Sequence, residues 1–238
     1  MSTSSIADIK PAFFTPTRQI AHCGHATIAT FNFLAQQGQF GEGSFTKETI
    51  DRARKIVLRR NEAFMAQTAP EFQPLADLQP QLLESLGLRP KQIIAPPMRV
   101  DTGNGFVVIG VTDLSVLAAI QPQLRAIDVL SDQRDVIGFY VFSLDTVHPD
   151  RHASARMFAS RYGIPEESAT GMAAGPLAAY LAHQLPQPQT LFLIEQGHFM
   201  APASPSIIQV QLERDAQTIH SLMTSGSATF IDYLTLEV

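Results

Sequence analysis

The segment Arg18-Gln19-Ile20-Ala21-His22-Cys23-Gly24-His25-Ala26-Thr27-Ile28-Ala29-Thr30 holds the single cysteine of the chain and two of its seven histidines. An apolar run, Ile28 to Leu34, follows at once and predicts a helix over about 25–37. Gly24 therefore lies where an extended segment turns into a helix, and glycine allows a tight turn there. Because the first N–H groups of a helix lack internal partners and the helix dipole is positive at that end, this turn is a candidate anion site.

A second segment repeats the pattern far downstream. Glu166-Glu167-Ser168-Ala169-Thr170-Gly171-Met172-Ala173-Ala174-Gly175 opens another apolar helix, predicted over Thr170–Leu185. Gly24-His25-Ala26 lines up with Gly171-Met172-Ala173. Small residues also recur by chance, so the match alone leaves open an internal duplication. If the duplication is real, two helix N-termini face one shared cleft.

Composition narrows the class of protein. The chain has 238 residues, of which 45% are hydrophobic and 16% charged, with a net charge of -5. An acidic balance argues against a general nucleic-acid role. One cysteine cannot form an internal disulfide framework, and we find neither a membrane-length apolar run nor a signal peptide. We expect a soluble cytoplasmic protein.

Short strand-like runs separate the helices. They predict an α+β fold with mostly antiparallel sheet, because the short connections suit hairpins better than crossovers. Asn104-Gly105 between apolar stretches predicts a hairpin, and a helix over 114–127 is interrupted near Pro122. The other expected elements are strands over 12–15, 55–65, 136–144, 153–159, 190–195, 207–213 and 228–238, and a helix over 76–88.

A proline-closed linker, Ile93 to Pro97, predicts a domain boundary. We therefore expect an N-terminal lobe over 1–97 and a C-terminal lobe over 98–225. Residues 226–238 are expected to form a final strand that returns to the N-terminal lobe.

The first segment offers several chemistries. His22, Cys23 and His25 are poor metal ligands together, because adjacent ligands fit one tetrahedral ion badly and nothing nearby completes the set. Cys23 is either a reactive thiol at a helix N-terminus or a small buried residue. His25 is either a general acid or base, since its ordinary pKa lies near neutrality, or a polar residue of the helix start.

The residues of the second segment can likewise have either a chemical or a structural role. The helix dipole favours Glu166 and Glu167 whether or not they react. Thr170 either caps the helix or binds a ligand. His198 is a candidate cleft residue, whereas His148 looks like a surface or connector residue. Nucleotide-binding glycine motifs and a serine-hydrolase elbow are absent from the sequence, so nucleotide cofactors and serine hydrolysis are unsupported.

At these two segments the chain resembles the phenazine-biosynthesis PhzF-like family, within the diaminopimelate-epimerase-like fold. The first block is Phe14-Thr15-Pro16 through Gln19 to Cys23-Gly24-His25-Ala26-Thr27, and the second is Arg156-Met157-Phe158-Ala159 through Glu167 to Thr170-Gly171-Met172-Ala173. The resemblance runs from about Ala12 to the end. It implies two pseudo-symmetric lobes, each a central helix wrapped by mostly antiparallel strands, with a cleft between them, and it makes the duplication the expected origin of the two segments.

The resemblance also implies an activity. Family members move a proton on a small acid, need no metal or organic cofactor, and form homodimers. His25 stands at the family's histidine and Glu167 at its aspartate, so these two are the expected catalytic residues. A small anionic metabolite is the expected ligand, with no nucleic-acid or membrane partner. The expected substrate-binding residues are Cys23, Gly24, Ala26, Thr170, Gly171, Met172 and Ala173.

Departures from the family pattern point to an alternative. The family's general-base glutamate belongs to a segment upstream of Phe14, and the chain begins too late to contain it. Met172 replaces a serine and cannot donate a hydrogen bond. Thr170 stands where related epimerases have a second cysteine, so a two-thiol mechanism is not expected. The alternative to an isomerase is a catalytically inactive binding or structural relative.

Overall fold

The computed structural model describes residues 4–14, 19–20, 23–50, 53–60, 62–185, 189–216, 218–226, 228, 230 and 232. The helices are α1 (Gly24–Gln36), α2 (Gln79–Ser85), α3 (Leu114–Ala119), α4 (Leu124–Gln133) and α5 (Gly171–Gln184), with 3-10 turns at Pro90–Gln92 and Ser160–Tyr162. The strands are β1 (Phe13–Phe14), β2 (Gln19–Ile20), β3 (Gly43–Glu48), β4 (Ala53–Arg59), β5 (Glu62–Gln67), β6 (Glu71–Pro74), β7 (Met98–Asp101), β8 (Gly105–Val111), β9 (Gly138–Ser143), β10 (Ala153–Ala159), β11 (Ile164–Glu167), β12 (Leu191–Gln196), β13 (Ser206–Arg214) and β14 (Ile219–Gly226).

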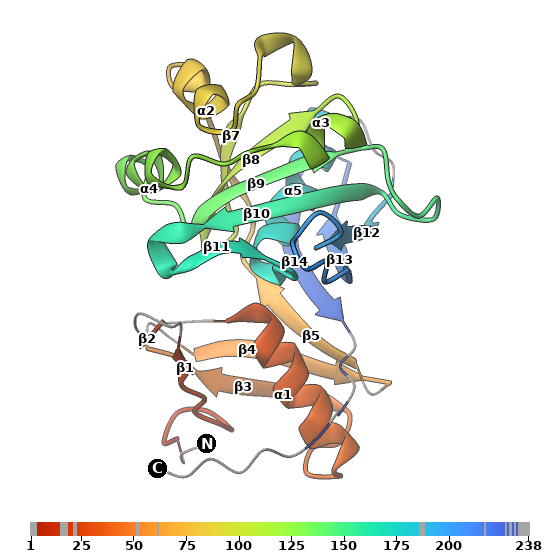
Figure 1. Ribbon diagram of the computed structural model, residues 1–238. Helices are drawn as coiled ribbons and strands as arrows, with labels where there is room; N and C mark the ends of the chain where they lie inside the picture. Colours follow the sequence, from red (N-terminus) through yellow and green to blue (C-terminus); the bar gives the residue numbers. More distant parts are fainter. Residues whose placement is uncertain are drawn as a thin grey trace.

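One long sheet runs through both lobes in the order β3-β4-β5-β14-β13-β12-β10-β9-β8-β7-β6. The lobes join where β14 pairs with β5, from Leu222 opposite Gln67 to Gly226 opposite Ala63. Figure 1 shows the two lobes stacked at this junction. The pairs β8–β9 and β10–β12 are parallel, and the other pairs along this order are antiparallel. The predicted α+β class with mostly antiparallel sheet is confirmed.

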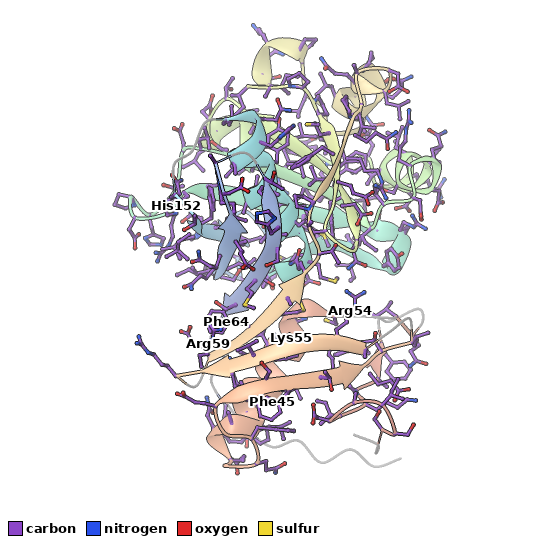
Figure 2. All side chains as sticks on the ribbon, turned by 180° about the vertical axis from the view of Figure 1, so that it is seen from behind. Phe45, Arg54, Lys55, Arg59, Phe64 and His152 are labelled. Atoms are coloured by element: carbon purple, nitrogen blue, oxygen red, sulfur yellow. The ribbon has the colours of Figure 1, made fainter. Side chains whose placement is uncertain are left out.

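In the first lobe, α1 packs against β3, β4 and β5. Phe31 and Leu34 of the helix meet Ile56, Leu58 and Met65 of the strands in one buried cluster. Figure 2 shows the reverse of this sheet, with Arg54, Lys55 and Arg59 along β4. In β4 the apolar run from Ile56 to Leu58 is buried, and the charged residues Lys55 and Arg59 on either side of it are exposed.

In the second lobe, the strands wrap the buried helix α5. Leu177 and Tyr180 of α5 pack against Tyr140, Phe142 and Phe192 of the surrounding strands. A further cluster on the opposite face of β8 and β9 packs under α2, α3 and α4. Both faces of these strands are therefore covered, which explains why β8 and β9 read as continuous apolar runs rather than alternating ones.

Several expected elements needed correction. The stretch 55–65, read as one run, forms the two strands β4 and β5, with a positive φ of 51° at Arg60 in the turn. Strands β3, β6, β11 and β14 were not predicted. The expected last strand, 228–238, lies largely outside the described residues, although Phe230 contacts Phe33 of α1 and Ala228 accepts a hydrogen bond from Gln36.

Residues just before the expected boundary after Pro97 pack against strands that follow it. Strand β6 pairs with β7, and Leu82, Leu83 and Leu86 of the α2 region join the second lobe's outer cluster. Residues 71–97 thus pack with the second lobe, because their apolar side chains cover β8 and β9. Whether 1–97 and 98–225 act as separate domains stays a prediction. Among the helices described, none combines the length and apolar character that a membrane crossing requires.

Candidate active site

The two helix starts singled out in the sequence meet in space. His25 Nδ1, in the first turn of α1, lies 3.2 Å from the carbonyl oxygen of Ala169, which precedes α5. A Cβ built on Gly24 would lie 3.5 Å from both the backbone nitrogen and Cγ of Met172. This is an ordinary van der Waals distance, so the start of α1 lies directly beside the start of α5.

A cavity of about 200 Å³ opens at this meeting point. Most of the predicted site residues line it, namely Cys23, Gly24, His25, Glu167, Thr170, Gly171 and Met172. Ala26 and Ala173 do not. Ala173 is fully buried and its N–H donates to the Thr170 carbonyl, so the structure gives no support to its expected ligand contact. His22 lies outside the described residues.

The start of α5 borders this cavity with backbone N–H groups that have no partner within the helix. The first intrahelical bonds there run from Ala173 and Ala174 to the Thr170 carbonyl. Gly171 and Met172, which line the cavity, precede those bonds, so their N–H groups have no acceptor within the helix. With the positive end of the helix dipole, they form a site suited to a carboxylate or phosphate.

His25 carries the strongest electrostatic perturbation of the site. The Cys23 sulfur lies 3.6 Å from Nε2 and 3.8 Å from Nδ1 of its ring. Hydrogen bonding to Cys23 raises the pKa of His25 most, with further increases from electrostatic attraction to Cys23 and Glu167 and from the Ala169 carbonyl. These effects exceed the lowering by partial burial and bring the pKa to about 9, so His25 is an imidazolium at neutral pH.

The adjacent carboxylates Glu166 and Glu167 have different surroundings. Glu166 accepts two hydrogen bonds of 2.8 Å from Arg156, whose guanidinium also donates to the carbonyls of α3 and its C-terminal end. Glu167 is half-buried and lines the cavity, and its carboxylate accepts a 3.3 Å hydrogen bond from the Ser168 N–H. Glu166 is therefore tied into the structure, whereas Glu167 is available to a ligand.

Two residues that the sequence did not single out shape the site. The fully buried Gln196 donates to the Glu167 carbonyl and to Thr170 Oγ1, and its Oε1 accepts from Thr170 N–H and Tyr140 OH. It thereby fixes the loop that ends at α5. Asn104 lines the cavity and its Nδ2 lies 3.7 Å from Met172 Sδ. The hairpin motif at Asn104-Gly105 predicts a turn but not a site residue, and the partners of both Asn104 and Gln196 include residues far away in the sequence.

A second, larger cavity of about 540 Å³ shares His25, Gly24 and Gly171 with the first. His148 and His198 line it as well, so the expectation that His198 borders a cleft agrees with its position. Cys23 is half-buried rather than buried, which disfavours the purely structural interpretation of the thiol. Its only described imidazole neighbour at this helix start is His25, a set too small for a metal site by itself.

Comparison with known proteins identifies a family and related isomerases. The chain matches the PhzC-PhzF family, described as phenazine biosynthesis-like protein, over residues 2–232. An uncharacterized isomerase of Deinococcus radiodurans is 32% identical over 231 residues, which cover 91% of this chain and 73% of that protein. A trans-2,3-dihydro-3-hydroxyanthranilate isomerase of Pseudomonas aeruginosa is 26% identical over 227 residues, which cover 92% of this chain and 76% of that protein.

The same relationship holds in three dimensions. A crystal structure of a Bacillus anthracis phenazine biosynthesis protein of the PhzF family superposes with a TM-score of 0.85 at 25% identity. The match covers 99% of this chain and 83% of that one. The two-lobed fold expected from the resemblance is therefore confirmed.

Proposed function

The chain belongs to the PhzC-PhzF family, and we propose that it is an isomerase that moves a proton on a small carboxylate-bearing metabolite. One observation carries this proposal: His25, Glu167 and the start of α5 line a single cavity. The cavity thus joins an imidazolium, a carboxylate and helix N–H groups without an acceptor in their own helix, which are the parts that acid-base catalysis on an anion needs.

Substrate binding follows from charge. The carboxylate of the substrate would accept hydrogen bonds from the N–H groups of Gly171 and Met172. The imidazolium of His25 adds a positive charge at the same cavity. Ile137, Met157 and Tyr162 supply apolar walls, so the rest of the substrate would be a small unsaturated or cyclic carbon skeleton.

In the proposed reaction the substrate loses one proton to Glu167 and gains one from His25. The Glu167 carboxylate takes a proton from a carbon next to a conjugated double bond, and the electron pair of that C–H bond enters the conjugated system. The double bond shifts, and the far carbon takes a proton from the His25 imidazolium. Glu167 ends protonated and His25 neutral, and a proton passing between them, directly or through water, restores the starting state. The substrate gains and loses one proton, so the net reaction is an isomerisation.

The name of the P. aeruginosa relative supplies a first test compound. The chain would be incubated with trans-2,3-dihydro-3-hydroxyanthranilate and with simple unsaturated carboxylates such as cyclohexadiene carboxylates, and the position of the double bond followed by NMR. Conversion by the wild type and its loss in Glu167→Gln support the proposal. Equal conversion by both proteins would contradict the role of Glu167. His220→Ala, at an exposed histidine on β14, is the matched control.

Met172 favours the alternative of a protein that binds without turnover. Its thioether occupies the position where the resemblance predicts a serine, and methionine offers no donor to a carboxylate. This alternative predicts that a small carboxylate binds in the cavity and returns unchanged. The expected homodimer, independence of cofactors and cytoplasmic location are likewise proposals for this chain.

A further inference from the structure

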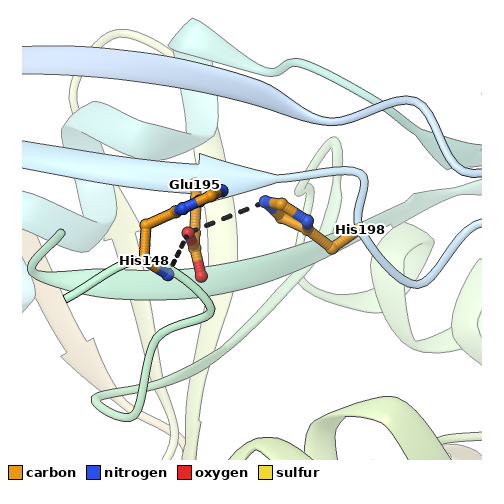
Figure 3. Close-up of side chains that lie close together, drawn as sticks. All are labelled: His148, Glu195 and His198. Carbon is orange, nitrogen blue, oxygen red and sulfur yellow. Dashed lines mark hydrogen bonds and ion pairs between the residues drawn. The ribbon is translucent and has the colours of Figure 1, made fainter.

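A second group of ionisable side chains lies apart from Cys23 and Glu167. Glu195, at the end of β12, is fully buried. Its Oε2 lies 3.6 Å from Nε2 of His198, and His148 brings a third ligand atom, so that all three lie within 4.8 Å of one another. Figure 3 shows the three side chains together, with dashed lines from the Glu195 carboxylate to the His198 ring and to the backbone nitrogen of His148.

Part of this arrangement has a structural explanation. Glu195 accepts a 2.5 Å hydrogen bond from the Val147 N–H and a 3.3 Å bond from the His148 N–H. These bonds anchor the loop after β9. They do not account for two imidazole rings at the same carboxylate, with ring centroids 5.6 Å apart. A carboxylate has about four acceptor positions, so Glu195 keeps capacity for a cation after both backbone bonds.

The backbone holds His198 in place beside Glu195. Gly197 has φ +84°, and a Cβ there would lie 2.0 Å from the Ser204 carbonyl oxygen. The Ser204 N–H donates to the Gly197 carbonyl at 3.0 Å and closes the loop. Only glycine fits this turn, so the backbone that leads into His198 is fixed by a closed loop.

We propose that His148, Glu195 and His198 bind a divalent transition-metal ion, for which zinc is the best match. Two imidazoles and one carboxylate, with a fourth position left open, are a recurrent zinc ligand set. Ligand atoms at about 2.0–2.2 Å from a tetrahedral ion lie about 3.4 Å apart. The His198–Glu195 separation of 3.6 Å is already close to this value, and rotation of the exposed His148 side chain would bring in the third ligand.

The open position would face the larger cavity. His148 and His198 both line the cavity of about 540 Å³ that also contains His25. Two neutral imidazoles, one carboxylate and a divalent ion carry a net charge of +1, so the bound ion would attract an anionic group into that cavity. Imidazole ligands disfavour magnesium and calcium, which prefer oxygen donors. The resemblance implies no metal, so this inference departs from the family expectation.

The test uses the full chain without a histidine tag, stripped with a chelator and titrated with zinc chloride in a calorimeter. We expect one zinc ion per chain. His198→Ala and His148→Ala should each weaken binding at least about 10–100-fold, the loss that even an outer partner of a ligand causes. His220→Ala should bind as the wild type. The double variant Cys23→Ser/His25→Ala should also retain the ion, because it leaves the three ligands intact.

Cobalt supplies an independent readout. Co²⁺ in the chain should give the visible absorption of a four- or five-coordinate ion without the near-ultraviolet band of a cobalt-thiolate bond. No zinc binding by the wild type, binding unchanged in both His148→Ala and His198→Ala, or a thiolate band that disappears in the Cys23→Ser/His25→Ala variant would overturn the proposal. Circular dichroism checks that each variant is folded.

Discussion

Nδ1 of His25 lies 3.2 Å from the carbonyl oxygen of Ala169, and this contact joins the start of α1 to the start of α5. A carbonyl oxygen only accepts, so Nδ1 carries a proton and donates it. Nε2 then lies 3.6 Å from the Cys23 sulfur. The orientation of the His25 imidazole in one lobe is therefore set by the backbone of the other lobe.

Replacing His25 should abolish most of the activity while leaving the fold intact. A general acid typically contributes about 10²–10⁴-fold in rate, so His25→Gln should lower kcat by that range. The side chain is exposed, so the variant should still fold, but the loss of the imidazolium should lower the midpoint of thermal unfolding below about pH 9. Kinetics of His25→Gln beside His220→Ala check this, and equal kcat values in the two variants would rule out His25 as the acid.

The pH dependence of activity should report the same imidazolium. Because the pKa of His25 is raised to about 9, kcat/KM should fall as pH rises through about 9. The hydrogen bond to Cys23 raises the pKa of His25 most. In Cys23→Ala the fall of kcat/KM should therefore begin at lower pH. An NMR titration of the His25 ring measures the shift directly. An unchanged pKa in Cys23→Ala would show that the thiol does not act on the imidazole.

The free energy of unfolding should also fall as pH rises toward about 9. A pKa raised in the folded state means that the folded chain binds a proton more tightly than the unfolded chain does. The resulting stabilisation is fully present below the ordinary value of 6.5 and is lost as pH rises through about 9. Urea unfolding of the wild type and Cys23→Ala across this window should show the smaller pH dependence in the variant. A steeper dependence in Cys23→Ala would contradict the assignment.

The neighbouring glutamates should respond in opposite ways to the same substitution. Glu166→Gln leaves the nearly buried guanidinium of Arg156 without its charge partner, which should cost about 2–3 kcal/mol, somewhat less than the 3–5 kcal/mol of a fully buried pair. Glu167→Gln should leave the free energy of unfolding nearly unchanged and remove activity. Chemical denaturation and kinetics of both variants separate the roles. A large loss of stability in Glu167→Gln alone would reverse them.

Gln196 should act as a positioning residue for the loop before α5. Gln196→Met keeps the approximate volume but leaves Thr170 and Tyr140 with unsatisfied buried groups, at about 1–3 kcal/mol for each group. Because the same loop carries the Ala169 carbonyl, the titration of His25 should change as well. A variant that is destabilised but has an unaltered His25 titration would indicate a structural role only.

The two helix starts were predictable because each depends on local chemistry. In both α1 and α5 a glycine is followed by a mostly apolar run, and this local pattern predicts the start of a helix. Strand β14 was missed because its sequence, Ile219 to Gly226, is largely polar and becomes a strand only by pairing with β5 and β13. Such pairing between distant segments leaves no signal in a local pattern.

The part of the candidate site that lies at the two helix starts was predictable, because those starts have local sequence signals. His25 and Glu167 lie beside the predicted helix starts, and the structure places both at one cavity. The distinction between Glu166 and Glu167 was not visible, since it depends on Arg156 reaching Glu166 across the β10–β11 pair. Gln196 and the His148–Glu195–His198 group likewise depend on residues that only the folded sheet brings together.

The most direct test of the central claim is solvent deuterium exchange. Trans-2,3-dihydro-3-hydroxyanthranilate and the cyclohexadiene carboxylates would be incubated with the chain in D₂O, and deuterium on carbon measured by mass spectrometry. The account predicts incorporation by the wild type and its loss in His25→Gln and Glu167→Gln, with His220→Ala unaffected. A wild type that binds any of these acids and returns it without deuterium would contradict proton transfer and favour a binding role.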